Sequence, residues 1–224
     1  MTRLVLFDLD GTLVDSAPGI HASVRVAAAT LGLPEPTSAQ LRAMVGPPLP
    51  DGFALAFGLA GLDVDRAVAA YRTHYAAGAM LAAPAYPGIP QLLTRLVADG
   101  VTLAVATSKP EQFAVRILDH VGLLDRFASV HGATLDGAVR HKEQVVAAAL
   151  ARHPEGRDPV LVGDRAQDVL GAAAHGLPCI GAGWGPAAEG ELAAAGAVAI
   201  AATPADVIGA LDAVMYGRSG LRGI

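Results

Sequence analysis

Acidic residues follow two of the apolar segments that the sequence places in buried strands. Asp8 and Asp10 come directly after the apolar run Arg3 to Phe7, and Asp164 follows the run Val160 to Val162. Because side chains alternate along an extended chain, Asp8 and Asp10 leave the strand on the same side. Ligands of open α/β sheets bind at the carboxyl ends of the strands. We therefore expect these acids to share one cleft.

Several carboxylates in one cleft repel one another, and a divalent cation would relieve that repulsion. Oxygen ligands without His or Cys nearby favour Mg²⁺ over Zn²⁺. Gly11 permits a tight turn after the first acid pair, and Asp168 follows Asp164 by one helical turn. Asp168 alone is more simply interpreted as an acid at a helix N-terminus. For Asp8, Asp10 and Asp164 together, a metal site is the better interpretation.

Hydroxyl and cationic side chains follow another apolar run. Thr107 and Ser108 directly precede Lys109, and Lys142 begins a segment with helical periodicity. These are the two lysines among 16 basic residues, which suggests that a compact point charge is needed at both positions. A solvated surface cation is the alternative, and it is the preferred interpretation for Lys109 but not for Lys142. Thr107 also fits a helix N-cap, because Pro110 soon follows.

Strand-like and helix-like segments alternate after residue 86. The strand-like segments are short and have few polar residues, as in a parallel sheet covered on both faces. Apolar residues spaced three and four apart predict helices between them, for example over Ile89–Val97. This alternation predicts an α/β fold with a doubly wound parallel sheet. The predicted strands are Arg3–Phe7, Val101–Ala106, Phe127–Val130, Val160–Val162, Pro178–Gly181 and Val198–Ala201.

Residues 17–84 interrupt the alternation, because they contain no clear strand. About 70 residues is far more than a strand-to-strand crossover needs. We therefore expect an inserted small helical cap domain over 17–84 and an α/β core domain over 1–16 and 85–224. Turn-forming residues place the hinges near Asp15–Pro18 and Pro84–Gly88. The predicted cap helices cover Ser23–Leu31, Ser38–Val45 and Asp65–Met80.

The composition excludes several classes of protein. Apolar residues make up 53% of the chain, which is enough to bury a substantial core. A formal charge of −5 without a basic run argues against a nucleic acid partner, and the single Cys179 excludes an intrachain disulfide. The uncharged stretch Thr73–Thr94 contains several prolines and does not fit a membrane span. The short apolar start does not fit a signal peptide, so we expect a cytoplasmic protein. Gly217–Ile224 is predicted to be a frayed tail.

The motifs and their order resemble those of the haloacid dehalogenase-like hydrolase superfamily. The segment from Asp8 to Ser16 resembles the first motif, Thr107 the second, Lys142 the third, and Gly163 to Asp168 the acidic fourth. The phosphoglycolate phosphatase-like branch, which has a helical cap directly after the first motif, is the most similar. The secondary patterns that indicate this branch are Val45–Leu49, Tyr71–Tyr75, Tyr86–Gly88 and Leu135–Gly137.

This resemblance implies a Mg²⁺-dependent phosphatase that acts on a small phosphorylated metabolite. Asp8 would be the nucleophile that forms an aspartyl-phosphate, and Asp10 would act as general acid and base. Thr107 and Lys142 would complete the catalytic set. The metal ligands implied are Asp8, Asp10 through its backbone carbonyl, Asp164 and Asp168. The residues expected to bind substrate are Leu9, Gly11, Thr12, Ser108, Arg42 and Gly46.

The resemblance leaves the substrate open. Phosphoglycolate would need a cationic partner for its carboxylate, and the candidates are Arg25, Arg42, Arg72 and His21. For each of them, a surface or packing role is the preferred interpretation. A 5'-nucleotidase, a sugar-phosphate phosphatase or a phosphomutase fits the same motifs. A signalling receiver domain does not, because the acid pair ends the first strand and a large insert follows it. A catalytically inactive binding module is disfavoured by the complete motif set. The chain could be a monomer or a homodimer.

Overall fold

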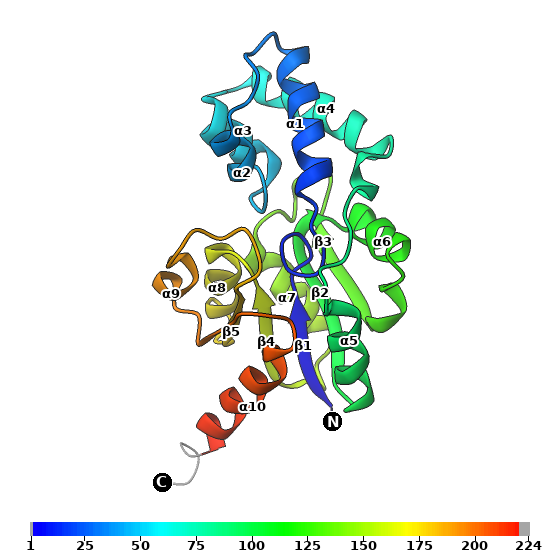
Figure 1. Cartoon of the computed structure of the whole chain (residues 1–224), viewed down its shortest axis with the longest axis vertical. Coiled ribbons are helices and arrows are strands. Elements are labelled where there is room, and N and C mark those ends of the chain that lie inside the picture. The colour runs from blue at the N-terminus through cyan, green and yellow to red at the C-terminus, as the bar shows by residue number, and fades with distance from the viewer. Residues whose placement is uncertain (1, 220–224) are drawn as a thin grey trace.

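The structure is a computed structural model of the chain, and it describes residues 2–219. Its centre is a six-stranded parallel sheet with the strand order β3-β2-β1-β4-β5-β6. Helices cover both faces of this sheet (Figure 1), which confirms the predicted doubly wound α/β fold. The strands are β1 (Arg3–Phe7), β2 (Thr102–Pro110), β3 (Ser129–Ala133), β4 (Arg157–Gly163), β5 (Cys179–Ala182) and β6 (Ala199–Ala201).

The alternation of side chains along the central strands divides the core into two clusters. Val5 and Phe7 of β1 pack with α5, α6 and α10 on one face, whereas Leu4 and Leu6 pack with α7, α8 and α9 on the other. Such two-sided burial explains why these strands are almost purely apolar. The helices of this part are α5 (Ile89–Ala98), α6 (Glu111–His120), η2 (Leu124–Arg126), α7 (Lys142–Arg152), α8 (Ala166–Ala173), α9 (Glu191–Ala195) and α10 (Asp206–Ser219).

The segment between β1 and α5 is helical, and we call it the helical insert. It lies beyond the carboxyl ends of the strands, drawn in blue and cyan in Figure 1. Its longest helices, α1 and α4, pack against each other, and α3 packs against α4. None of the helices within residues 2–219 is long and apolar enough to cross a bilayer. The helices of the insert are α1 (Ala17–Thr30), α2 (Ser38–Ala43), α3 (Leu49–Phe57), α4 (Leu62–Ala76) and the 3-10 turn η1 (Ala79–Leu81).

Two linkers join the helical insert to the sheet, and they run side by side. The backbone N–H of Asp15 donates to the carbonyl of Pro84 over 2.9 Å, and that of Tyr86 donates to the carbonyl of Leu13 over 3.1 Å. Val14 and Ala85 form an antiparallel bridge between these two bonds. The chain therefore enters and leaves the insert at one point of the fold.

Several element boundaries differ from those predicted. The predicted cap helices do not include α3 (Leu49–Phe57). Pro48 is its N-cap residue and Pro50 lies in its first turn, where the N–H that proline lacks would have no partner. Strand β2 runs four residues past Ala106, because Pro110 pairs with Ala133 of β3 after a register shift. The predicted tail is wrong for residues 217–219, which belong to α10; its remainder lies outside the described residues.

Candidate active site

The acidic cluster lies where β1 and β4 end. Asp8 directly follows β1 and Asp164 directly follows β4, and these strands are neighbours at the point where the strand order reverses. The carboxylate oxygens of Asp8, Asp164 and Asp168 lie within 4.8 Å of one another, and all three residues are buried. The structure thus brings together three of the four acids that the sequence predicts as metal ligands.

Two glycines allow this close approach. A Cβ atom at Gly11 would lie 2.4 Å from Oδ2 of Asp164, and the φ angle of Gly11 is +86°, which side chains rarely adopt. A Cβ atom at Gly163 would lie 2.4 Å from Cβ of Asp168. Both positions therefore exclude any larger residue while the carboxylates keep their places.

Lys142 holds two of the acids together. It begins helix α7, and its ammonium lies 2.5 Å from Oδ1 of Asp8 and 2.7 Å from Oδ1 of Asp168. It also donates to the carbonyl of Ala106 over 2.9 Å, so all three of its donors have acceptors. Burial disfavours this ammonium, but attraction to Asp168 and Asp8 outweighs burial and raises the pKa of Lys142. Lys142 therefore stays charged between the two carboxylates.

Asp164 has one satisfied and one unsatisfied oxygen. Its Oδ1 accepts a hydrogen bond from the Thr12 hydroxyl over 2.9 Å. Its Oδ2 is buried and has no hydrogen-bond partner among the described residues. Burial is the main cause that raises the pKa of Asp164 well above its usual range, and the charges of Asp168 and Asp8 add to it. A buried acceptor without a partner is costly.

The cluster as a whole has the properties of a cation site. Burial raises the pKa of Asp8 to about 6; Lys142 opposes this shift, and Asp168 and Asp10 add to it. Lys142 alone therefore does not compensate the crowded acids. Asp164 offers a free oxygen, and the donors are all carboxylates, which suits a hard divalent cation. The described residues fit Mg²⁺.

Asp10 lies apart from this cluster and pairs with the second lysine. Oδ2 of Asp10 is 2.7 Å from the ammonium of Lys109, and both side chains are almost fully buried. The same ammonium donates to the hydroxyl of Tyr75 over 2.8 Å and lies 4.8 Å from the centre of the Tyr75 ring. Tyr75 belongs to helix α4, so this contact joins the sheet to the helical insert.

The hydroxyl residues after β2 lie beside these groups. Thr107 is buried, and its Oγ1 accepts a hydrogen bond from the backbone N–H of Lys109 over 3.2 Å. The alternative role of Thr107 as a helix N-cap is wrong, because Pro110 is the N-cap residue of α6. Ser108 lines a small cavity between the sheet and the insert.

This cavity lies between the sheet and the helical insert, and residues of both line it. The sheet side contributes Asp10, Ser108 and Lys109, and the insert side is mostly apolar and aromatic. The predicted substrate residue Gly46 is part of its wall. The lining residues from the helical insert and from α6 are Ile20, Met44, Gly46, Pro47, Leu49, Tyr71, Tyr75 and Phe113.

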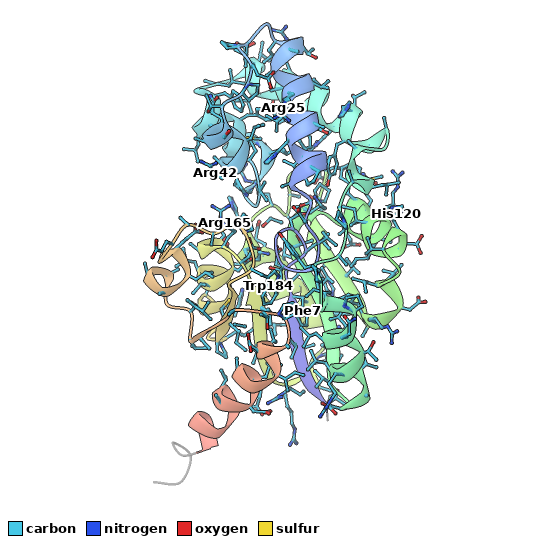
Figure 2. All side chains as sticks on the ribbon, viewed as in Figure 1. Phe7, Arg25, Arg42, His120, Arg165 and Trp184 are labelled. Atoms are coloured by element: carbon cyan, nitrogen blue, oxygen red, sulfur yellow. The ribbon has the colours of Figure 1, made fainter. Side chains whose placement is uncertain are left out.

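Contacts at the rim hold the insert against the sheet. The guanidinium of Arg165 donates to the carbonyl of Val45 over 2.5 Å and pairs with Glu191 at 2.9 Å. Figure 2 shows Arg165 on the sheet side, just below the insert. Asp51 of α3 pairs with Arg140 at 3.4 Å.

Some predicted substrate residues lie elsewhere or act differently. Arg42 is exposed on α2 and does not line the cavity. Thr12 is fully buried and its hydroxyl is taken by Asp164, so it orients a metal-ligand candidate and is not available to a substrate. Arg25 forms an exposed ion pair with Glu35. These corrections share one cause, because sequence spacing does not show which way a side chain on a helix or turn is directed.

Two residues of the site were not selected from the sequence. The prediction that Lys109 is a surface cation is wrong, since its side chain is 5% exposed and paired with Asp10. The sequence did give a reason to select Lys109, because lysine is scarce in this chain and Lys109 lies at the end of a predicted strand. Tyr75 belongs to the pattern Tyr71–Tyr75, but nothing in the sequence indicated its contact with Lys109, which lies 34 residues away.

The comparison with protein families shows the family of this chain. Residues 5–182 match the family model described as haloacid dehalogenase-like hydrolase. The chain belongs to this family, which confirms the resemblance found in the sequence. The match contains all the acids of the cluster and both lysines.

Curated relatives carry several names. A 5'-nucleotidase of Pseudomonas aeruginosa is 41% identical over 85% of this chain and 86% of its own length. A phosphoglycolate phosphatase of Xanthomonas campestris is 37% identical over 82% of this chain and 84% of its own length. The tyrosine-protein kinase PtkA of Mycobacterium tuberculosis is 45% identical over 82% of this chain, which spans 62% of that longer protein.

Solved structures agree with the fold. A predicted phosphatase from Clostridium acetobutylicum superposes with a TM-score of 0.84 and 37% identity, over 89% of this chain and 93% of that one. A haloacid dehalogenase-like hydrolase from Streptococcus pneumoniae gives a TM-score of 0.85 and 30% identity, over 94% and 98% of the two chains.

Proposed function

We propose that this protein is a Mg²⁺-dependent phosphatase that hydrolyses a small phosphate monoester through an aspartyl-phosphate on Asp8. The observation that carries the proposal is the arrangement of the acids. Asp8 lies in a buried cluster with Asp164 and Asp168, whereas Asp10 lies two residues away with a separate lysine. This arrangement supports a mechanism in which Asp8 attacks and Asp10 exchanges a proton. We further propose that the chain has two domains, an α/β core over 1–16 and 85–224 and a helical cap over 17–84.

In the first step, a carboxylate oxygen of Asp8 attacks phosphorus, and the bond between phosphorus and the ester oxygen breaks. Asp10 gives its proton to the departing oxygen, so that an alcohol leaves. The products are the free alcohol and a phosphoryl group bound to Asp8.

In the second step, water attacks the phosphorus of the Asp8 phosphoryl group. Asp10 takes a proton from this water, and the bond between phosphorus and Asp8 breaks. Inorganic phosphate leaves, and both carboxyl groups return to their starting states. A single side chain can serve both steps because it ends the first step without its proton.

The remaining residues would hold the phosphoryl group and the metal. Lys142 would place a positive charge beside Asp8, and the Thr107 hydroxyl and the backbone N–H groups near Leu9 and Ser108 would bind phosphoryl oxygens. When bound, Mg²⁺ would supply the positive charge that lets an anionic carboxylate approach an anionic phosphate. Its proposed ligands are Asp8, the backbone carbonyl of Asp10, Asp164 and Asp168.

The helical insert would act as a cap that excludes bulk water and selects the leaving group. The cavity wall on its side is mostly apolar, so the leaving group would meet aromatic and aliphatic surface. Relatives named 5'-nucleotidase and phosphoglycolate phosphatase support a small metabolite as the substrate. We place this activity in the cytoplasm.

A panel of phosphate esters tests the proposal. The purified protein is incubated with phosphoglycolate, nucleoside 5'-monophosphates and sugar phosphates, with Mg²⁺ or with a chelator, and released phosphate is measured. We expect metal-dependent release that is abolished in Asp8→Asn, and the best ester identifies the substrate class. Release that survives both the chelator and Asp8→Asn would contradict the mechanism.

A phosphomutase is the second candidate, because the same acid pair can return the phosphoryl group to a sugar phosphate. It predicts a requirement for a bisphosphate primer and a phosphoenzyme that persists in the absence of acceptor. Rapid chemical quench with a labelled ester separates the two, since a phosphatase loses its label to water within each turnover.

A further inference from the structure

The two oxygens of Asp10 have different surroundings. Oδ2 is paired with the Lys109 ammonium at 2.7 Å. Oδ1 is buried and has no hydrogen-bond partner within the described part of the chain. Because Asp10 lines the cavity, Oδ1 is the oxygen left to exchange a proton with a leaving group.

Lys109 keeps the two oxygens of Asp10 in these different surroundings. An ammonium attracts whichever oxygen is nearest, so it prevents the carboxylate from rotating freely about its Cβ–Cγ bond. Both side chains are almost fully buried, so solvent hardly competes for this contact.

The position of Lys109 depends in turn on the helical insert. The Tyr75 hydroxyl accepts a hydrogen bond from its ammonium. The Tyr75 ring stacks on Tyr71 with centres 5.2 Å apart and meets the edge of Phe113 of α6 at 5.7 Å. Tyr75 is therefore held firmly, and it meets Lys109 because the C-terminal end of α4, which carries Tyr75, reaches the end of β2.

We propose that Lys109 is a positioning residue for the general acid, and that Tyr75 completes the Lys109–Asp10 arrangement when the cap closes. This inference rests on the proposed phosphatase function and adds to it a link between cap closure and proton transfer. With the cap open, Lys109 loses one of its acceptors and Asp10 loses its fixed orientation. The proton is then delivered only when the substrate is enclosed.

Esters with different leaving groups test the link. The alcohol of an alkyl phosphate needs a proton to depart, whereas p-nitrophenol leaves readily as an anion. In Lys109→Met, we expect kcat/KM for the best alkyl ester of the panel to fall about 100-fold, and kcat/KM for p-nitrophenyl phosphate to fall less than about 10-fold, because general acid catalysis contributes roughly 10²–10⁴-fold. Circular dichroism and thermal melting check that the variant folds.

Two tyrosine variants test the part played by the cap, and they also serve if Lys109→Met does not fold. Tyr75→Phe keeps the ring and removes the hydroxyl. We expect it to lower the alkyl-to-aryl ratio of kcat/KM about 10-fold, the lower end of the effect of one hydrogen bond to a charged group. Tyr71→Phe is the matched control on the same helix and in the same ring stack. It should keep the wild-type ratio.

The outcomes separate this inference from the proposed function. Equal losses for the two esters in Lys109→Met or in Tyr75→Phe would overturn the inference, because a residue that binds phosphate or supports the fold affects both substrates alike. A change of the ratio in Tyr71→Phe as large as in Tyr75→Phe would overturn the role of the Tyr75 hydroxyl. Absence of phosphate release from both esters by the wild-type protein would overturn the proposed function itself.

Discussion

The two lysines of the chain hold the carboxylates of the site in two different ways. Lys142 lies among Asp8, Asp168 and the carbonyl of Ala106, all of which belong to the sheet side of the molecule. Lys109 lies between Asp10 of the sheet side and Tyr75 of the helical insert. The proposed nucleophile, Asp8, is thus held entirely within the sheet side of the molecule, whereas the proposed general acid, Asp10, is held at the boundary between the sheet and the insert.

In the proposed mechanism, the acids that bind the metal must stay in place throughout the reaction, whereas the proton donor must be in position only once per turnover. The acids that would bind a metal must stay close together, and their backbone is fixed by paired parallel strands. The proton donor must act only after a substrate has entered. A contact that spans the insert and the sheet suits that requirement, because domain closure can make and break it.

The largest effect is expected from Lys142→Met. Removal of this ammonium leaves Asp8 and Asp168 without their cation, so kcat/KM should fall about 10³-fold for alkyl and aryl esters alike. Breaking a buried ion pair should also lower the free energy of unfolding by about 3–5 kcal/mol in the absence of metal. Steady-state kinetics and urea titration measure both. A selective loss on alkyl esters would contradict the assigned difference between the two lysines.

Thr12→Val should have the next largest effect. Its hydroxyl orients Asp164 from outside the ligand set, and loss of such a bond typically weakens metal binding about 10–100-fold. We expect the Mg²⁺ concentration for half-maximal activity to rise by this factor, with a nearly unchanged maximal rate. Thr94→Val, at an exposed position of α5, is the matched control. A fall in maximal rate at saturating Mg²⁺ would instead favour contact between Thr12 and substrate.

Arg165→Ala should have a smaller effect, confined to closure of the insert. It removes the bond to the Val45 carbonyl and the pair with Glu191, and KM should rise about 3–10-fold as the closed state becomes less populated. Arg140→Ala removes an exposed insert-to-sheet pair and should change KM less than about twofold. Equal effects of the two variants in steady-state kinetics would contradict a special role for Arg165.

The smallest expected effect is the dependence of thermal stability on pH. The folded pKa of Asp8 is raised to about 6 from an unfolded value of 3.8, so the folded state binds the proton more tightly. The stability of the metal-free protein should then fall as the pH rises through this window. Mg²⁺ binds the deprotonated acids, so it should raise Tm by several degrees at pH 8 and by about 1 °C or less at pH 5. Equal shifts in calorimetry at both pH values would contradict this.

The core of the fold and the acid cluster could be predicted from the sequence because both follow from local rules. Buried parallel strands have uninterrupted apolar sequences, and their carboxyl ends lie at one edge of the sheet. Asp8 and Asp164 lie close together because β1 pairs with β4. The motif resemblance then supplied an order and a role for each residue.

The remainder depends on tertiary contacts that no local rule contains. Lys109 was taken for a surface residue because its partner Tyr75 is on an inserted helix whose placement against the sheet is not encoded in spacing. Arg42 was selected by charge, yet α2 leaves it exposed. Helix α3 was missed, although its one internal proline, Pro50, lies in the first turn, which is the part of a helix that tolerates proline.

The paired linkers have a consequence for how such proteins can change. The backbone of Asp15 is hydrogen-bonded to that of Pro84, so the two ends of the helical insert are neighbours. Lengthening a segment between two neighbouring ends adds little to the entropy lost when the loop closes. A segment of different length can therefore replace the insert without disturbing the register of the sheet. The gene segment that encodes the proposed cap, residues 17–84, should therefore be exchangeable as a unit. Exchanging it between relatives should transfer substrate preference while the strands, and the acids at their ends, stay where they are.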